Sequence, residues 1–398
     1  MSLNSMKKYF LLTFLIALFQ CFGINLQIGN SYEWALEKSS EIVEITTCPI
    51  YTCKPENVSF TEDTCVLWDE ASNSYFCRPC TDSSKMCTNS SKQNSTCSLP
   101  IPPDRTGQSY PGEKCYSSDD CDPTVTLSCT KGVCKGLSAN KACSSMFSCN
   151  PGLICNSNKC QPQTKVGSKG CFTDYDCENG AGCNVTDNLN FNANLCIKYG
   201  TVHPHEIITS CSNNFSLLCE YAYCAEHNDV FVCTNQLKSA GSIPLACTTK
   251  GASCTSTSDD YFDPPFSITN ENSCECAFTA SGNELYCNLF YGDDPYMTYF
   301  KKLLEWLHSS DVKKCNAGRR LDNWCIHSNW DKKNYDTLTY YQVNVNYYPF
   351  IQKTESCVLN SLCEEGYWMY RENYNKDDDN DDSSAAFLAL SILISELV

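Results

Sequence analysis

A pair of cysteines separated by five residues recurs in this chain every 28 residues. The pair occupies residues 115–121 ("CYSSDDC"), 143–149 ("CSSMFSC") and 171–177 ("CFTDYDC"), and two more cysteines follow each pair at less regular distances. The twelve cysteines of these three repeats are Cys115, Cys121, Cys129, Cys134, Cys143, Cys149, Cys155, Cys160, Cys171, Cys177, Cys183 and Cys196. A unit this short, with so few large apolar side chains, cannot bury a useful core and usually needs disulfides, metals or oligomerisation.

This pattern favours two disulfides per repeat, and each would stabilise the folded repeat by roughly 2–4 kcal/mol. Four cysteines allow three connectivities, and the sequence does not choose among them. Zinc is the competing interpretation, but zinc sites favour C-x2-C pairs. The gaps here reach twelve residues, and residues 115–196 contain no histidine. We therefore expect disulfides, with no metal and no cofactor.

The N-terminus predicts export from the cell. Lys7 and Lys8 precede an apolar run at 9–19, and a cut after Gly23 would complete a signal peptide over residues 1–23. Its removal takes away Cys21 and leaves 32 of the 33 cysteines, an even number that can pair completely. Such an oxidised chain is expected to pass through the secretory pathway to the extracellular space or the outer face of the plasma membrane.

Five N-x-S/T sequons agree with this pathway, because each can carry a surface glycan in a eukaryotic secreted protein. They lie at Asn57, Asn89, Asn94, Asn184 and Asn214. We expect some of them to be glycosylated.

The charge balance argues against a nucleic-acid partner. The chain has 46 acidic and 29 basic residues, for a formal charge of −17. A nucleic-acid binder needs a basic footprint, and none is evident from this balance. The acidity mainly implies solubility and repulsion from anionic surfaces.

The repeats resemble a known family. The residues that carry the resemblance are "GEKCYSSDDCDPTVTLSCTKGVCKG" (112–136) and "ACSSMFSCNPGLICNSNKC" (142–160). They are similar to the Dickkopf N-terminal-like cysteine-rich repeat, as it occurs in tandem in secreted and surface proteins of ciliated protists, and the similarity covers residues 112–197. It implies a secreted, disulfide-bonded interaction module. The related Dickkopf region binds a receptor, but those contact residues cannot be matched here, so Wnt antagonism is not implied.

The segments around the repeats set the predicted domain organisation. An N-terminal cysteine-rich segment (24–98) leads through a Pro/Gly-rich linker (99–112) to the three tandem repeats (113–200) and then to a C-terminal cysteine-rich α+β region (201–370). The fold class we expect is therefore a tandem of small disulfide-rich modules, built from short β-hairpins and loops, with an α+β C-terminal region.

Cysteine counts suggest how the flanking segments are joined. The N-terminal segment holds seven cysteines and the C-terminal region thirteen, so both counts are odd. If the repeats close on themselves, either one bridge joins the two flanks or each flank keeps a free thiol, and we favour the bridge. Cys211, Cys219 and Cys224 reproduce two gaps of the first repeat, which suggests a degenerate fourth repeat without its first cysteine.

Two secondary-structure elements are predicted in the C-terminal region. Residues 294–311 form the best helix pattern, with Asp294 as cap, Pro295 in the first turn and apolar residues at helical spacing. The segment "LTYYQVNVNYYPFI" (338–351) is rich in Tyr, Val and Asn and predicts a strand.

The end of the chain has the layout of a glycosylphosphatidylinositol (GPI) signal. An acidic polar spacer (371–384) precedes a hydrophobic tail (385–398) that is too short to span a membrane. The attachment candidates are Asn375, Asn380 and Ser383. The alternative is a soluble secreted protein that ends in a free helix. The membrane is expected as a partner only through this lipid anchor.

No catalytic motif stands out. The pair "CRPC" (77–80) has thiol-oxidoreductase spacing but lacks the βαβ setting, so structural disulfides are favoured. "HPH" (203–205) makes a poor metal site and is expected in a solvated linker. A pocket that gathers His327, Asp322 or Glu305 would argue for an enzyme in the C-terminal region.

We therefore predict a non-enzymatic, extracellular or cell-surface cysteine-rich glycoprotein that acts in recognition, adhesion or a surface coat. Its partner would be a protein or a glycan, and the sequence leaves the ligand and the oligomeric state open. The alternative is a soluble secreted factor or a structural matrix protein. A hydrolase-type activity in 201–370 is the least favoured class.

Overall fold

The computed structural model describes residues 48–358, except for 54–57, 62, 83–84, 88–93, 99–105, 126–127, 186–191, 209–210, 212–214, 228–229, 236–237, 240, 242, 261–265 and 356. At Met86, 258–260 and 266–270 only the backbone is described. The predicted signal peptide, the acidic spacer and the hydrophobic tail lie outside the described residues. The described part is a disulfide-rich, β-rich fold with a helical C-terminal region.

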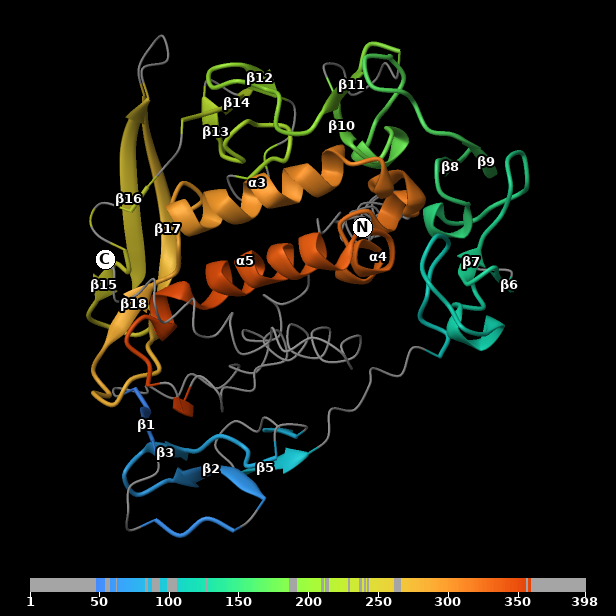
Figure 1. The fold of residues 1–398 in the computed structure, drawn as a ribbon. Coiled ribbons are helices and arrows are strands. Elements are labelled where there is room, and N and C mark those ends of the chain that lie inside the picture. Colours follow the sequence, from blue (N-terminus) through green and yellow to red (C-terminus); the bar gives the residue numbers. More distant parts are fainter. Residues whose placement is uncertain are drawn as a thin grey trace, which may run out of the picture.

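A pair of helices lies at the centre of the molecule, and the small sheets surround it (Figure 1). Helix α3 (Asp294–His308) packs against α5 (Lys332–Ile351), and the short α4 (Asn323–Asn329) lies between them in the chain. The predicted helix at 294–311 is confirmed, although it ends at His308 and its N-cap is Asp293 rather than Asp294. Met297, Phe300, Leu303, Trp306 and Leu307 are buried in the main core.

The predicted strand at 338–351 is wrong, because these residues belong to α5. The Asp331 side chain caps this helix by accepting a hydrogen bond from the backbone of Asn334 at 3.0 Å. Tyr335, Leu338 and Val345 then join the same core as the apolar face of α3. The preference of tyrosine and valine for strands is weak and depends on context, so packing against α3 overrides it.

The three predicted repeats share one architecture, and we call them modules 1, 2 and 3. Each has a turn of 3-10 helix that ends at its second cysteine, followed by an antiparallel hairpin that carries the third and fourth. The 3-10 turns are Ser118–Asp120, Met146–Ser148 and Asp174–Asp176. The hairpins are β6 (Ser128–Thr130) with β7 (Val133–Lys135), β8 (Leu153–Asn156) with β9 (Lys159–Pro162), and β10 (Ala181–Asn184) with β11 (Leu195–Lys198).

The structure pairs all twelve repeat cysteines, the first with the third and the second with the fourth. The disulfides are Cys115–Cys129, Cys121–Cys134, Cys143–Cys155, Cys149–Cys160, Cys171–Cys183 and Cys177–Cys196. The third and fourth cysteines of each module face each other across the hairpin without bonding to each other. The two crossed bridges therefore tie the hairpin to the preceding loop, and cysteines make up most of each module's small core.

A fourth module follows the third and is complete. Cys211 bonds to Cys224, and Cys219 bonds to Cys233, in the same crossed pattern. Its strands are β12 (Ile207–Ile208), β13 (Cys224–His227) and β14 (Val230–Cys233). The predicted fourth repeat thus exists, but the idea that it lacks its first cysteine is wrong, because Cys211 fills that position and Cys233 is the fourth cysteine.

Two further units use the same crossed pairing. One has bridges Cys247–Cys274 and Cys254–Cys287 on strands β15 (Ala246–Cys247), β16 (Ser253–Asp260), β17 (Phe266–Cys276) and β18 (Leu285–Cys287). The other has Cys65–Cys87 and Cys80–Cys97 on β1 (Ile50–Cys53), β2 (Thr64–Asp69), β3 (Ser74–Cys77), β4 (Met86–Cys87) and β5 (Ser95–Ser98). In both, the last two bridged cysteines again face each other on paired strands.

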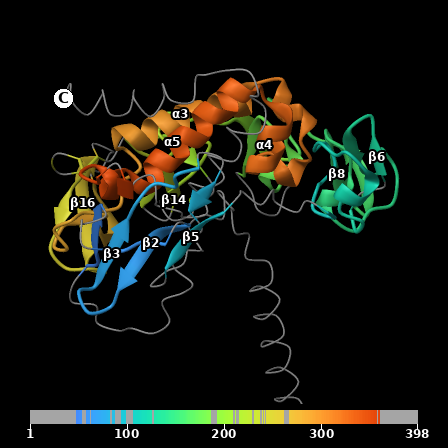
Figure 2. The same ribbon diagram turned by 60° about the horizontal axis from the view of Figure 1, so that its bottom comes forward.

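Two disulfides, not one, join the N-terminal segment to the C-terminal region. They are Cys48–Cys276 and Cys53–Cys357. The prediction of a bridge was therefore right in kind but wrong in number. Cys77 is buried and has no disulfide partner among the described residues, and Cys363 lies outside them. Figures 1 and 2 place the sheet β1–β5 and the β15–β18 unit at one end of the helices, with β6–β9 at the other end.

The predicted linker at 99–112 is wrong in its second half. The backbone of Ser109 forms an isolated β-bridge with that of Cys121, and the Gly112 backbone N–H donates a hydrogen bond of 3.0 Å to the carbonyl oxygen of Cys134. Residues 106–112 are thus part of module 1, because their backbone groups complete its hydrogen bonding. Residues 99–105 lie outside the described part. Within the described part, no helix has the length and apolar character that crossing a membrane requires.

Candidate recognition surface

One short segment holds the first three modules in place. We call residues 311–331 the hub turn; they contain two 3-10 turns (Asp311–Lys314 and Ala317–Arg319), the Cys315–Cys325 disulfide and α4. The disulfide closes a loop of ten residues, which keeps this segment compact although it is largely irregular. Its side chains and backbone contact modules 1, 2 and 3 in turn.

Two asparagines make reciprocal contacts between the hub turn and the modules. Asn316 is fully buried, and its Nδ2 donates to the carbonyl oxygens of Met146 (3.1 Å) and Cys149 (2.8 Å) in module 2. From module 3, Asn179 Nδ2 donates to the carbonyl oxygens of Val312 (2.9 Å) and Cys315 (2.8 Å). These side-chain donors pair with backbone carbonyl oxygens across the contact, so the docked arrangement is specific.

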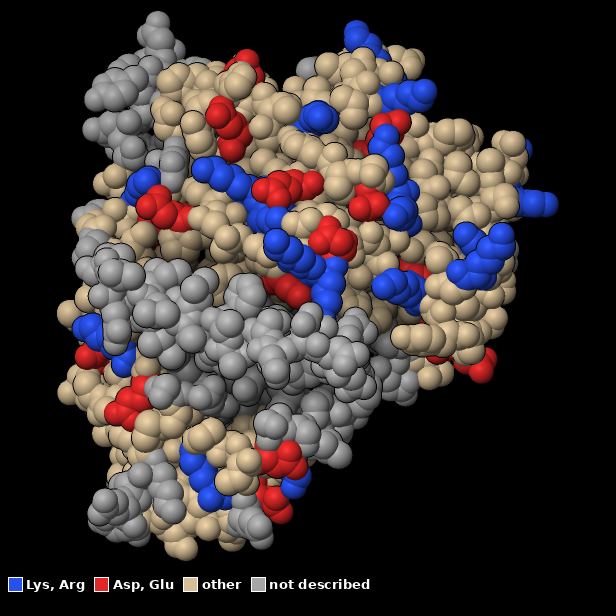
Figure 3. Space-filling model, viewed as in Figure 1, with Lys and Arg blue, Asp and Glu red and all other residues tan. Residues whose placement is uncertain are grey.

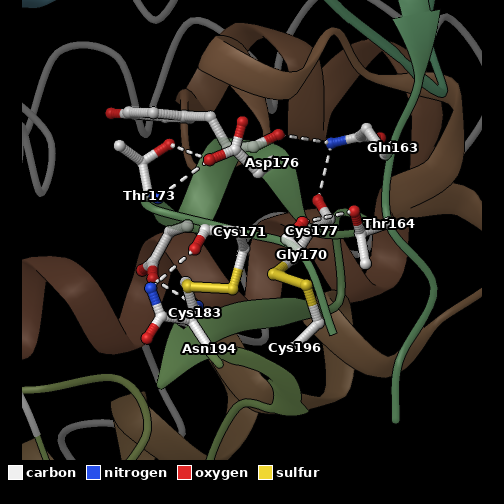
Figure 4. Close-up of a disulfide and its surroundings, with 12 residues drawn as sticks. Gln163, Thr164, Gly170, Cys171, Thr173, Asp176, Cys177, Cys183, Asn194 and Cys196 are labelled. Carbon is white, nitrogen blue, oxygen red and sulfur yellow. Dashed lines mark hydrogen bonds between the residues drawn. A yellow bond between two sulfur atoms is a disulfide. The ribbon is translucent and has the colours of Figure 1, made fainter. Parts of the chain in front are cut away.

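Two neighbouring arginines of the hub turn bind modules 1 and 3. Arg319 Nε donates to Glu113 Oε1 of module 1 at 3.2 Å and stacks over the Tyr110 ring at 4.3 Å. Arg320 Nη1 donates to the carbonyl oxygen of Asp174 in module 3 at 3.0 Å. Figure 4 shows the disulfides and hydrogen bonds that hold the loops of module 3.

The Arg320 contact extends into a buried network. Its Nη2 contacts the hydroxyl of Tyr199, and that hydroxyl donates to Asp174 Oδ2 at 3.0 Å. Complete burial raises the pKa of Tyr199 well above its ordinary value, while Arg320 acts in the opposite direction. Tyr199 therefore stays a protonated donor, and the network closes the seam between module 3 and the helices.

Two glycines allow the backbones of modules 1 and 3 to approach the hub turn and α3 closely. A Cβ on Gly112, whose φ is +96°, would lie 2.0 Å from the carbonyl oxygen of Lys314. A Cβ on Gly180 would lie 2.6 Å from the carbonyl oxygen of Leu307. No side chain fits at Gly112 without moving the hub turn, or at Gly180 without moving the end of α3, so both glycines are required for close docking of modules 1 and 3.

The outer faces of the modules display apolar side chains. Among the described residues, the exposed large apolar side chains are Tyr116, Val166, Phe172, Ile207 and Val230, and all of them lie on modules 1, 3 and 4. Tyr116 is fully exposed, whereas Phe172 is 46% exposed. Both directly follow the first cysteine of their module, and the backbone N–H of each donates to the aspartate that ends the 3-10 turn of that module, Asp120 or Asp176. Modules 1 and 3 thus present an aromatic ring from the same repeat position, where module 2 has Ser144.

The predicted glycosylation and anchor sites are only partly within the described residues. Asn94 is exposed, and its Oδ1 accepts a hydrogen bond from the Trp68 backbone at 2.9 Å. Asn184 is half-buried at the end of β10. Five other predicted sites lie outside the described residues: Asn57, Asn89, Asn214, and the anchor candidates Asn375 and Asn380. Ser383 lies outside them as well.

The "CRPC" pair does not form a redox centre. Cys80 bonds to Cys97, while Cys77 is buried apart from it. Burial, together with the negative charge of Glu355, raises the pKa of the Cys77 thiol to about 12. A redox-active thiol needs a lowered pKa, so this environment opposes that chemistry.

The histidines and acids that would have suggested an enzyme do not converge. His203 Nδ1 pairs with Glu220 Oε2 at 2.9 Å, and His205 lies near Asn235 instead. Asp322 caps α4, Glu305 pairs with Lys302 on the surface, and His327 packs between the rings of Trp324 and Tyr335.

A small apolar pit lies among residues of module 4, α3, α4 and α5. Its walls include Leu217, Tyr299, Ile326 and Leu338, and His327, Asp322 and Glu305 do not line it. Its volume of about 10 Å³ leaves room for roughly one water molecule. This pit is too small to hold a substrate.

Sulfur atoms gather in the modules without forming a metal site. In module 1, the sulfurs of Cys115, Cys121 and Cys134 lie within 4.8 Å of one another, as do the corresponding atoms in modules 2 and 3. Each of these sulfurs is already half of a disulfide. Their proximity results from the crossed bridges, which stack two disulfides in one small core.

No family model, no curated protein and no solved structure matches this chain. The resemblance to Dickkopf-like repeats stays a prediction.

Proposed function

We propose that this protein is an extracellular or cell-surface glycoprotein that acts by recognition, adhesion or coat formation rather than by catalysis, and that modules 1 to 4 carry its contact surface. The abundance of disulfides fits an extracellular, secreted-type protein. A predicted signal peptide, the sequons and a GPI anchor complete the proposal from the sequence.

One observation carries the proposal: the exposed large apolar side chains of the described residues all lie on docked modules, with modules 1 and 3 held by the hub turn and module 4 packed into the main core that α3 and α5 share. Docking and crossed disulfides fix these modules before any partner arrives, so little conformational entropy is lost on binding. Exposed aromatic rings on a rigid support are typical of protein and glycan contacts.

The test uses the full chain, expressed in a eukaryotic host and labelled with a fluorophore. We expect saturable binding to cell surfaces or to isolated extracellular matrix, competed by the unlabelled protein. The double variant Tyr116→Ser/Phe172→Ser should bind at least about thirtyfold more weakly, since two hot-spot aromatics that each contribute more than about 1 kcal/mol contribute more than about 2 kcal/mol together. Ser144→Ala, a change at the same repeat position in module 2, is the matched control and should bind normally.

Non-saturable association would contradict recognition and would support a structural coat without a dedicated partner. Unchanged saturable binding by the double variant would remove the modules' aromatic positions from the contact surface.

The anchor has a separate test. Intact cells that express the full chain are treated with phosphatidylinositol-specific phospholipase C, and release into the medium is expected. A protein already in the medium that retains Val398 would overturn the anchor and favour the soluble secreted alternative.

A further inference from the structure

One segment of this acidic chain has a net positive charge. Residues 123–173 contain six lysines and no aspartate, glutamate or arginine, so this stretch carries a formal charge of +6. The rest of the chain then carries −23 against the −17 of the whole. The net charge of the chain masks a local excess of positive charge over modules 1, 2 and 3.

All six lysines are exposed. They are Lys131, Lys135, Lys141, Lys159, Lys165 and Lys169, which we call the lysine cluster. The salt bridges that lysines make within the described residues all lie elsewhere, as in Lys85–Asp63, Lys238–Asp294, Lys302–Glu305, Lys313–Glu178, Lys314–Asp311 and Lys353–Glu284. Among the described residues, the positive charge of these six lysines is therefore not compensated by paired acids.

The six lysines are distributed along modules 1, 2 and 3 and do not converge on one point. Lys131 occupies the β6–β7 turn, Lys135 ends β7, and Lys141 and Lys159 lie on adjoining segments of module 2, where Ala142 pairs with Lys159. Lys165 and Lys169 lie in the connection that enters module 3. At the end of the molecule that carries β6–β9, Figure 3 shows basic side chains on the outer surface and acidic ones along the lower rim.

The size of a module makes these charges act together. A folded unit of 28 residues has a radius of gyration of about 8 Å, which is close to the Debye length of about 8 Å at physiological ionic strength. Lysines on different sides of one module therefore contribute to a common positive potential. Spread over three modules, they suit a long partner with repeated negative charges better than a single small anion.

We propose that the lysine cluster binds a linear anionic polysaccharide that carries sulfate or carboxylate groups. The partner is a polysaccharide because the disulfides fit an extracellular protein, and because exposed polar side chains lie between the lysines. Asn140, Ser157 and Asn158 are exposed in turns with positive φ and can hydrogen-bond to sugar hydroxyls. Lysines without arginine supply point charges rather than the planar fork that favours phosphate.

An anionic membrane is the less favoured partner. Surface-bound membrane elements combine lysines with a broad apolar face. Among the described residues of this segment, the large exposed apolar side chains are Val166 and Phe172 alone. The proposal specifies a partner class within the proposed recognition function and rests on that function.

The test measures binding of the full chain to dextran sulfate and to polygalacturonate, with neutral dextran as the uncharged control. We expect binding to at least one anionic polymer, none to dextran, and a steep loss of affinity as salt rises. The variant Lys131→Gln/Lys141→Gln/Lys159→Gln should bind at least about tenfold more weakly, because it removes three of the six positive charges that attract the polymer. The control Lys250→Gln/Lys301→Gln/Lys333→Gln removes the same charge from exposed lysines elsewhere and should bind within about twofold of the wild type.

Three outcomes would overturn the proposal. They are absence of binding to both anionic polymers at low salt, equal losses in the two triple variants, and binding to phosphatidylserine vesicles without binding to either polymer. Saturable cell binding that persists without polysaccharide binding would remove this inference alone and leave the recognition function in place.

Discussion

Arg319 of the hub turn donates a hydrogen bond of 3.2 Å to Glu113, a carboxylate that is fully buried in module 1 and lies 206 residues away in sequence. The second carboxylate oxygen of Glu113 accepts from the backbone of Tyr110 at 3.0 Å. Module 1 is therefore held to the hub turn by an ion pair whose carboxylate, Glu113, has no access to water. Such a pair costs much more to break from one side than it contributes as a pair.

Arg319→Ala should loosen module 1 because it leaves the Glu113 carboxylate buried without its cation. We expect a loss of roughly 3 kcal/mol in the local stability of the docked module. Hydrogen exchange at the backbone amides of Gly112 and Cys134 should then speed up by about a hundredfold. Lys313→Ala, which breaks the exposed pair with Glu178, is the control and should change exchange little. Adding Glu113→Gln to Arg319→Ala should restore part of the protection, and equal exchange in all variants would contradict the role of the pair.

Asn316→Asp should release module 2 from the hub turn. The aspartate keeps an acceptor for the Gly318 backbone, which donates to Asn316 Oδ1 at 2.9 Å. It also places a carboxylate oxygen against the carbonyls of Met146 and Cys149, so we expect a destabilisation of about 3 kcal/mol. Mass-spectrometric hydrogen exchange should show faster exchange confined to residues 137–162. Asn158→Asp makes the same chemical change on an exposed turn and should be silent; equal exchange in the two variants would argue against the contact.

Cys77 and Cys363 are expected to form a sixteenth disulfide. The other thirty cysteines beyond residue 23 are paired in the structure, and two cross-bridges leave one odd cysteine on each flank. Val358 lies in the same small core as Cys77, and the five residues from Val358 to Cys363 can span about 17 Å. Peptide mapping without reductant should recover the Cys77–Cys363 pair.

The result that would contradict this disulfide is a free thiol at Cys77. Alkylation of Cys77 only after denaturation, without reductant, would show a free thiol. Its lack of reaction in the native protein would then follow from burial and from a pKa raised to about 12.

The pKa of His203 should lie above the ordinary value for histidine. A hydrogen bond from the ring to Glu220 and the negative charge of that carboxylate favour the protonated form. This small contribution to stability is fully present below the pKa of the unfolded chain, and it is lost as the pH rises through the raised pKa of the folded one. NMR titration should show the raised value and its return toward normal in Glu220→Gln. Identical titration of His203 in the wild type and in Glu220→Gln would contradict the pairing.

Several features were predictable from the sequence because they depend on local spacing. The 28-residue period of the cysteines identified modules 1 to 3, and the apolar spacing around Phe300 and Leu307 identified α3. Each of these signals lies within one element or one repeat. The lysine cluster was also visible in the sequence, as a run of 51 residues without acids, but the total charge of the chain concealed it.

Other features depend on contacts between distant segments. The strand predicted at 338–351 is a helix because packing against α3 outweighs weak local preferences. The fourth module escaped full recognition because its gaps differ, and only the pairing of Cys211 with Cys224 fixes its register. The number of disulfides that join the N-terminal segment to the C-terminal region could not be predicted from the cysteine counts, since odd or even counts do not give the number of such disulfides.

The sequence by itself therefore determined that residues 113–200 are a series of small units that need covalent cross-links, because none of these units has enough apolar residues to fold without them. The tertiary structure decided which cysteines pair and where the modules sit. Crossed pairing requires each hairpin to fold back onto the loop before it, and docking requires Asn316, Arg319 and Arg320 to reach carbonyls and carboxylates more than a hundred residues away. Contacts of that range leave no periodic signal in the sequence, because geometry rather than spacing selects them.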